Sequence, residues 1–416
     1  MAVKRTIVAI GILIAGASVT HYAFRQPTPV GVVIITLDTT RADRLPPYGF
    51  SGVATPAIDT VAARGVVFAD ADTVAPLTLT AHTSLFTGLY PPRHGVRDNS
   101  ARPLEPTHDT LAEILHARGF RTGAFVGSAV LAADRGLSRG FDVYDDGGAP
   151  SLRPPDRRPG SDVVDRANAW IRSLNGATPF FLWVQLDDVH APQTLPPEFR
   201  RVYGDRYEGA IAYEDAQIAR LLDTLRARWL LDRTAIVIAG AQGESLGEHG
   251  EKEHGLFVYE STMHVPLIVA APGLPHGRVS TTTSLIDVLP TVLDLVGMGA
   301  RTVDGRSSVP AIRGEDVPDR PIYGESMYPL HLGSSPLRMI RDGRFKYIDA
   351  PKPELYDLQT DQSEMHNLSS ERPSIAAVLA GILRDGLSAD TQEVRASVLD
   401  PERRRTLEAL GYVSGR

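Results

Sequence analysis

The chain has 416 residues, of which 43% are hydrophobic and 22% are charged, a mix typical of folded proteins. Its formal net charge of −7 argues against nucleic acid as a partner. It contains no cysteine, which excludes disulfides, thiolate metal sites and cysteine nucleophiles. Any chemistry must therefore use oxygen and nitrogen groups.

The N-terminal residues 1–24 predict a signal peptide or membrane anchor. Lys4 and Arg5 precede an apolar run at 6–20, which is the order of charge and hydrophobicity in an export signal. The run is short for a membrane span, which needs about 20 apolar residues, although Tyr22 and Phe24 extend it. We therefore expect an exported protein, periplasmic or membrane-anchored and facing outside the cytoplasm, with cleavage and anchoring both left open.

After a linker at 25–30, the hydrophobic pattern becomes that of an α/β protein. Residues 31–37 form a continuous β-branched run, typical of a strand buried on both faces, and similar runs recur at 124–126, 180–184, 235–239 and 267–270. Apolar residues at helical spacing lie between them, most clearly from Ile218 to Leu225. This alternation predicts a mostly parallel sheet with helices on both faces, over residues 31–310.

A smaller C-terminal α+β subdomain with tail helices is predicted for residues 311–416. Its clearest element is 337–348, which has the pattern of two strands around Asp342-Gly343, a hairpin signal.

Two residues first suggest chemistry. Asp38 comes directly after the strand at 31–37, and ligand sites of parallel sheets lie at such carboxyl ends. A carboxylate there either holds a cation or caps the next turn. Thr78 precedes a helix predicted over 81–86, where a hydroxyl either caps the helix or lies beside an anion held by its free N–H groups. From these residues alone both interpretations stay open.

Ordered segments along the chain resemble the sulfatase family of the alkaline phosphatase superfamily, which also contains phosphodiesterases and phosphonate hydrolases. Residues 78–88, TLTAHTSLFTG, are similar to the sulfatase signature, with Thr78 in the nucleophile position. Further similar segments are 37–49, 55–68, 88–99, 119–128, 139–146, 239–250, 254–273, 284–297 and 353–361. The resemblance implies an alkaline phosphatase-like fold and a hydrolase acting on a small anionic ester of sulfate or phosphate.

The resemblance also implies roles for single residues. Thr78 cannot become formylglycine, because a secondary alcohol has no CH₂ to oxidise, so it resembles the branch in which a metal-activated hydroxyl attacks directly. Asn99 matches an amide that holds the oxyanion, His190 a contact to the ester or leaving group, and His254 a contact to the anionic group. His82 replaces the arginine of the sulfatase signature.

One departure affects the metal site that the family implies. Relatives use a divalent metal (calcium, manganese or zinc) held by Asp38, the nucleophile and an Asp-His or Asp-Asn pair. Here that pair is Ala241-Gln242, so Ala241 supplies no ligand and Gln242 at best a neutral amide oxygen. One carboxylate and two neutral oxygens, from Asp38, Thr78 and Gln242, make a poor divalent site.

Three functional hypotheses follow. The first is an exported, metal-dependent ester hydrolase with Thr78 as nucleophile and impaired activity. The second is an inactive pseudoenzyme that binds an anion or acts as a scaffold. The third is an envelope phosphoryl or headgroup transferase, which meets the same metal deficiency.

Overall fold

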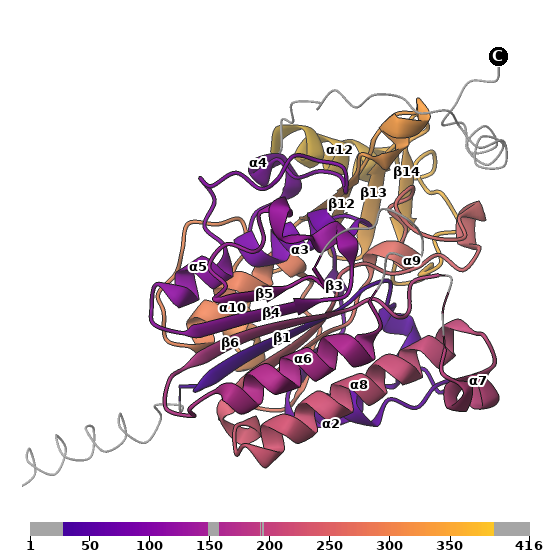
Figure 1. The fold of residues 1–416 in the computed structure, drawn as a ribbon. Helices are drawn as coiled ribbons and strands as arrows, with labels where there is room; N and C mark the ends of the chain where they lie inside the picture. Colours follow the sequence, from indigo (N-terminus) through magenta and orange to yellow (C-terminus); the bar gives the residue numbers. More distant parts are fainter. Residues whose placement is uncertain (1–27, 149–157, 192, 194, 387–416) are drawn as a thin grey trace, which may run out of the picture.

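The computed structural model describes residues 28–148, 158–191, 193 and 195–386, so the predicted export signal lies outside the described residues. Its centre is an eight-stranded sheet with the order β5-β4-β6-β1-β7-β8-β2-β9 (Figure 1). In chain order the strands of this sheet are β1 Gly31–Leu37, β2 Val66–Phe68, β4 Arg121–Val126, β5 Val143–Asp145, β6 Phe180–Leu186, β7 Thr234–Gly240, β8 Leu267–Ala270 and β9 Gly277–Val279.

Strand β1 lies in the middle of this sheet. It pairs in parallel with both β6 and β7, with Gly31 opposite Phe180 and Thr234. All seven of its residues are buried, and successive side chains enter opposite cores, as the β-branched run predicts. Strand β8 runs antiparallel to β7 and β2, so the sheet is mixed but mostly parallel.

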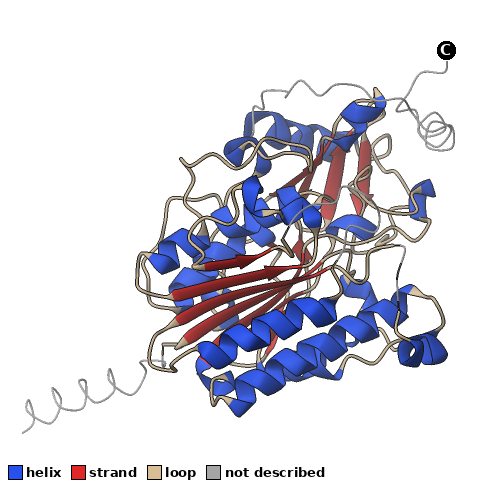
Figure 2. Cartoon of the chain, viewed as in Figure 1, coloured by secondary structure: helices blue, strands red, loops and turns tan. Residues whose placement is uncertain are grey.

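Helices cover both faces of the sheet (Figure 2). One face packs against α2 Pro56–Arg64, α6 Gly160–Ser173 and α8 Tyr207–Ala227, and the other against α3 Thr78–Thr87, α5 Leu111–His116 and α10 Val288–Leu295. The predicted fold class is thereby confirmed. The shorter helices are α4 Pro91–His94, α7 Pro197–Tyr203, α9 Glu260–Met263 and α11 Val309–Ile312. Within the described part of the chain, no helix is long and apolar enough to cross a membrane.

A second, antiparallel sheet follows near the C-terminus. Its order is β11-β12-β13-β14, with the helix α12 Pro373–Gly386 packed against β12 and β13. The strands are β11 Ile322–Ser326, β12 Leu337–Asp342, β13 Phe345–Asp349 and β14 Glu354–Asp357. The turn between β12 and β13 places Gly343 at φ 54°, which glycine adopts without strain. A two-stranded parallel sheet pairs β3 Ala71–Asp72 with β10 Thr283–Ser284.

A buried charge cluster joins this second sheet to the first. Lys346 of β13 is fully buried, and its Nζ lies 2.8 Å from Glu260 Oε1 and 2.9 Å from Glu364 Oε1. Arg341 of β12 lies 3.2 Å from Asp72. Arg341 also lies 3.0 Å from the partly exposed Asp70. The two cations thus face the buried carboxylates of Asp72 and Glu364 together with two less buried ones, so carboxylates outnumber cations in the cluster. Burial raises the pKa of Glu364 to about 7 and that of Asp72 to about 6.

This cluster predicts that the stability of the fold depends on pH and that Glu364→Gln reduces this dependence. A carboxyl group whose pKa is raised on folding holds its proton in the folded chain but not in the unfolded one, so its contribution to stability is present at low pH and lost as pH rises to about 7. Each unit of raised pKa is worth about 1.4 kcal/mol. We expect the thermal unfolding midpoint of the wild-type chain to fall more between pH 5 and pH 8 than that of Glu364→Gln.

The control is Glu371→Gln, which removes an exposed carboxylate from the segment just before α12. It should keep the wild-type pH dependence. If the unfolding midpoints of the wild type and Glu364→Gln changed equally with pH, Glu364 would be ionised in the folded chain. That result would contradict this account of the cluster.

Candidate functional site

Three of the predicted site residues meet at the carboxyl ends of β1 and β7. Asp38 follows β1, Thr78 begins α3, and Gln242 lies two residues after β7. The Thr78 hydroxyl donates a hydrogen bond to Asp38 Oδ2 at 3.0 Å and accepts one from Gln242 Nε2 at 3.2 Å. All three residues are buried. The residue expected to act as nucleophile therefore lies between a carboxylate and an amide.

The direction of these hydrogen bonds determines which way the Gln242 amide faces. A threonine hydroxyl has one proton, and Thr78 gives that proton to Asp38. Its oxygen must then accept from its second neighbour, so Gln242 turns its NH₂ group toward Thr78. The other amide atom, Gln242 Oε1, is buried and makes no hydrogen bond to any described residue.

These residues do not fit the divalent metal that the family resemblance implies. Ala241 is buried and presents only a methyl group, and Gln242 presents N–H donors to Thr78. Asp38 is then the only anionic group among the expected ligands, whereas calcium and manganese prefer several anionic oxygens and zinc prefers imidazole or thiolate. Across the described residues, no group of three or more histidine, aspartate or glutamate side chains is arranged to hold a metal.

Asn99 stabilises the start of α3. Its Oδ1 accepts a hydrogen bond from the backbone N–H of Leu79 at 2.9 Å, which satisfies one of the N–H groups left open at a helix start. The helix accordingly begins at Thr78, three residues before the predicted start. Asn99 Nδ2 makes no hydrogen bond to a described residue, so it remains available as the donor that the resemblance implies.

His82 occupies a different environment from the one expected of a residue lining the site. It is a fully buried residue of α3. Its Nδ1 lies 2.7 Å from the Thr78 carbonyl oxygen, and its Nε2 lies 2.9 Å from Thr36 Oγ1. Trp183 Nε1 donates to the same Thr36 hydroxyl at 3.0 Å, so the hydroxyl proton goes to His82. Burial lowers the pKa of His82 to about 4, which keeps the ring neutral. With both nitrogens engaged, His82 positions the first turn of α3 rather than contacting an ester.

His190 and His254 lie together. Their ring centroids are 4.8 Å apart with an interplanar angle of 81°. His254 Nδ1 lies 3.0 Å from Glu244 Oε1, and His190 Nδ1 lies 2.8 Å from the Ala191 carbonyl oxygen. A carbonyl oxygen can only accept, so His190 carries a proton on Nδ1. Sequence reasoning assigned no role to Glu244 as a partner of His254.

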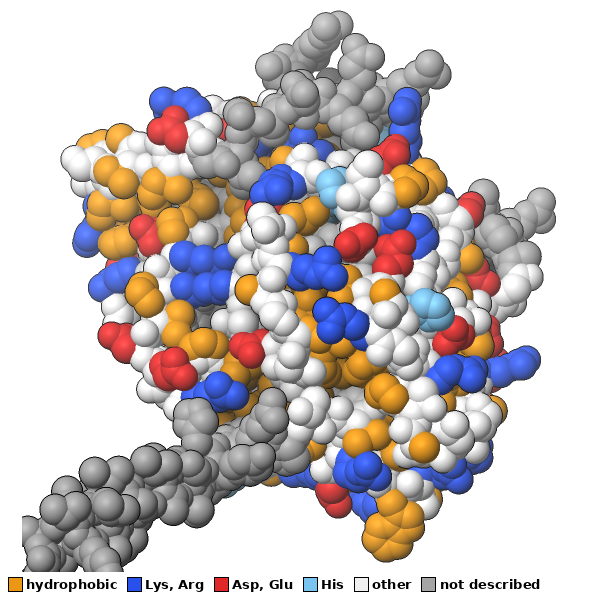
Figure 3. Space-filling model, turned by 90° about the vertical axis from the view of Figure 1, so that its left-hand side faces the viewer, with side chains coloured by type: hydrophobic (Ala, Val, Ile, Leu, Met, Phe, Trp, Pro, Cys, Tyr) orange, Lys and Arg blue, Asp and Glu red, His pale blue; other side chains and the backbone are white. Residues whose placement is uncertain are grey.

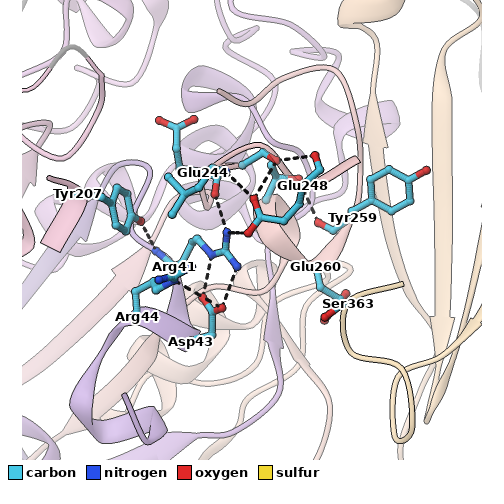
Figure 4. Close-up of polar contacts among 12 residues, drawn as sticks. Arg41, Asp43, Arg44, Tyr207, Glu244, Glu248, Tyr259, Glu260 and Ser363 are labelled. Atoms are coloured by element: carbon cyan, nitrogen blue, oxygen red, sulfur yellow. Dashed lines mark hydrogen bonds and ion pairs between the residues drawn. The ribbon is translucent and has the colours of Figure 1, made fainter. Parts of the chain in front are cut away.

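The loop after β7 connects the two groups of residues, since Gln242 contacts Thr78 and Glu244 contacts His254. Arg41 holds this loop: its guanidinium donates to the Glu244 carbonyl oxygen at 3.1 Å and to Glu248 Oε1 at 2.7 Å (Figure 4). The same guanidinium forms a two-point ion pair with Asp43, 2.8 Å at each contact. One buried cation thus ties the turn after β1 to the loop that carries the site.

Strand β11 and the segment that follows it contact the residues just before Asn99. His331 Nε2 lies 3.2 Å from Asp98 Oδ2, directly beside Asn99, and Arg97 forms two hydrogen bonds to Glu325 of β11 at 2.8 and 2.6 Å. These pairs join residues more than 200 positions apart. They belong to no motif, and hydrophobic periodicity contains no signal for them.

Asn99 offers a test that separates helix capping from anion binding. Asn99→Ala removes both the Oδ1 acceptor and the Nδ2 donor, and it should lower the free energy of unfolding by about 1 kcal/mol. Asn99→Asp keeps an oxygen that accepts from Leu79 but replaces the Nδ2 donor with a negative oxygen. We expect Asn99→Asp to unfold like the wild type, and both variants to lose sulfate binding measured by calorimetry. Wild-type sulfate affinity in Asn99→Asp would show that Nδ2 does not contact the anion.

Comparisons with known proteins identify the family of this chain. The family described as Sulfatase matches residues 31–298, and the family described as N-sulphoglucosamine sulphohydrolase, C-terminal matches residues 247–389. The choline-sulfatase of Rhizobium meliloti (strain 1021) is 35% identical over 208 residues, which are 48% of this chain and 40% of that protein. The Delta 4,5-hexuronate-2-O-sulfatase of Bacteroides thetaiotaomicron is 24% identical over 88% of this chain and 90% of that protein.

Solved structures show the same fold. The phosphonate monoester hydrolase of Agrobacterium radiobacter has a similar structure, with a TM-score of 0.72 and 22% sequence identity. The match covers 91% of this chain and 96% of that one. The Sulfatase match extends over well more than half of the sequence and includes every predicted site residue. The chain therefore belongs to the sulfatase family of the alkaline phosphatase superfamily.

Proposed function

We propose that this chain is an exported sulfatase-family protein that binds a small anionic ester and hydrolyses it poorly or not at all. The observation that carries the proposal is the hydrogen bond from Gln242 Nε2 to Thr78 Oγ1. In this arrangement the hydroxyl in the nucleophile position contacts an amide donor, where the family resemblance implies a metal ligand. Export is part of the proposal and is supported by the charge and hydrophobicity pattern of residues 1–24.

The chemistry of a threonine hydroxyl explains the low turnover. An alcohol is a weak nucleophile until a base or a cation lowers its pKa. Asp38 accepts the hydroxyl proton in a hydrogen bond, but a carboxylate is a weak base toward an alcohol. Neither Ala241 nor Gln242 places positive charge beside the ester oxygens. Losing even one such charge-stabilising group in an enzyme costs about 3 kcal/mol of transition-state stabilisation.

The remaining groups are suited to binding. Asn99 Nδ2 is a hydrogen-bond donor beside the start of α3, and the N-terminus of α3 is the positive end of the helix dipole. His190 and His254 lie together, and His254 contacts Glu244 on the loop that also carries Gln242. Asp38 opposes them, because its negative charge repels an anion. This balance favours a weakly held anion.

Replacing the altered pair tests the proposal. Ala241→Asp with Gln242→His adds a carboxylate and an imidazole next to Asp38 and should create a divalent metal site, detected as roughly stoichiometric zinc or manganese by calorimetry. The matched control, Ala241→Val with Gln242→Phe, also enlarges both positions but adds no oxygen or nitrogen that could bind a metal. A double variant that binds no more metal than the wild type would show that these two positions do not face the Asp38 site.

Asp38→Asn should change anion affinity in opposite directions under the two main hypotheses, a site without a metal and a metal-dependent hydrolase. Without a metal, removing the Asp38 charge relieves repulsion and should tighten sulfate or phosphate binding by roughly tenfold. With a metal, the same change removes a ligand and weakens anion binding. Titration calorimetry measures the affinity, and Asp205→Asn, which removes an exposed carboxylate before α8, serves as control. Weaker binding by Asp38→Asn would favour a metal-dependent hydrolase and contradict the proposal.

A further inference from the structure

The edge of the central sheet opposite the candidate site carries a basic surface. Parallel strands begin at one edge, and the register places Gly31 beside Phe180 and Thr234, and Arg121 beside Phe180. The turns that precede β1, β4, β6 and β7 therefore lie together. We define the amino-edge surface as the exposed arginines and the exposed tryptophan of these turns and of the adjoining helix ends: Arg64, Arg118, Arg121, Arg172, Arg226, Arg228, Trp229 and Arg233.

The charge of this surface is opposite to that of the whole chain. Asp142, Asp232 and Asp223 form ion pairs with three of its arginines, Arg121, Arg64 and Arg226. The side chains of three others form no ion pair with a described residue: Arg118, Arg172 and Arg233. The surface therefore has an excess of positive charge on a chain whose formal net charge is −7. Figure 3 views the molecule from this side and shows basic side chains (blue) over it, interspersed with acidic side chains (red) and with apolar ones (orange).

Trp229 lies in the turn before β7, which also carries Arg228 and Arg233, and packing explains it poorly. Its side chain is 84% exposed, and its φ is 56°, a backbone conformation that a bulky residue rarely adopts. The other two tryptophans, Trp170 and Trp183, are buried. Arginine at a helix C-terminus is favoured by the helix dipole, which accounts for Arg64, Arg172 and Arg226. The dipole accounts neither for Trp229 nor for Arg118 and Arg233, which follow the helix ends.

We propose that the amino-edge surface lies on an anionic phospholipid bilayer, with Trp229 at the level of the headgroups and the arginines against lipid phosphates. Tryptophan is enriched at membrane–water interfaces, and clustered arginines bind anionic lipid. The position of the N-terminal segment supports this partner: the apolar run at 6–20 precedes β1, and β1 begins at this edge, where Val30 N–H donates to the Arg233 carbonyl oxygen at 2.7 Å. A second copy of the chain fits less well, because a two-fold contact would place the same positive charges against each other.

This orientation has a consequence for the ligand. Thr78 and Gln242 lie at the carboxyl edge of the sheet, and a seven-residue strand such as β1 is about 23 Å long. The candidate site then faces the aqueous phase, away from the bilayer. A water-soluble ester reaches it, whereas a headgroup of the supporting membrane does not, which disfavours the headgroup transferase hypothesis.

Tryptophan fluorescence tests the proposal on the full-length chain in lipid nanodiscs. Trp229 is the one exposed tryptophan among three, so phospholipids brominated near the headgroup should quench about a third of the emission. Trp229→Phe should abolish this quenching. Nanodiscs containing phosphatidylglycerol should give at least twofold more quenching than nanodiscs of phosphatidylcholine alone. Emission that brominated lipid does not quench, or equal quenching of Trp229→Phe, would overturn the proposal.

A charge series gives an independent result. Arg118→Gln, Arg172→Gln and Arg233→Gln combined should lower quenching in phosphatidylglycerol to the level seen with phosphatidylcholine. The matched control combines Arg200→Gln, Arg201→Gln and Arg206→Gln, three exposed arginines of α7 and the turn after it, and should behave like the wild type. Equal effects of the two triple variants would overturn the proposal, as would a concentration-dependent dimer in which Trp229 becomes shielded without lipid.

Discussion

The hydrogen bond from the Gln242 amide to the Thr78 hydroxyl constrains every interpretation of this site. Thr78 has one proton and gives it to Asp38, so the oxygen expected to act as nucleophile accepts a hydrogen bond from a neutral amide. A carboxylate and an amide cannot activate an alcohol as a cation does. The proposal of low turnover depends on this contact, because Gln242 presents an amide donor where the family resemblance implies a metal ligand.

Contacts in the surrounding structure hold the site residues in place. His82 and Asn99 each form a hydrogen bond to the backbone of the first turn of α3, and Arg41 anchors the loop that carries Gln242 and Glu244. Each of these contacts is buried or partly buried and uses groups that would be costly to leave unpaired. They hold the site residues in place whether or not catalysis occurs, which is consistent with a fold retained for binding.

The sequence predicts the fold well because its signals are local. The buried run at 31–37 and the helical stripe at 218–225 each require only neighbouring residues to be recognised, and both became the expected elements, β1 and part of α8. Asp38, Thr78 and Gln242 were also placed together, through the family pattern and the shared carboxyl edge of the sheet. Contacts made across the fold were not predictable in this way: Glu244 meets His254 because a loop returns on itself, and His331 reaches Asp98 from the segment between β11 and β12. The burial of His82 depends on Thr36 and Trp183, which lie on two other strands.

The central claim is that the Asp38 site functions without a divalent metal. Its most direct test is the metal content of the wild-type chain, purified without chelators from the compartment in which it is made, and measured by elemental analysis. The account predicts well below one equivalent of calcium, manganese or zinc per chain. One equivalent of any of these, lost on Asp38→Ala, would contradict it.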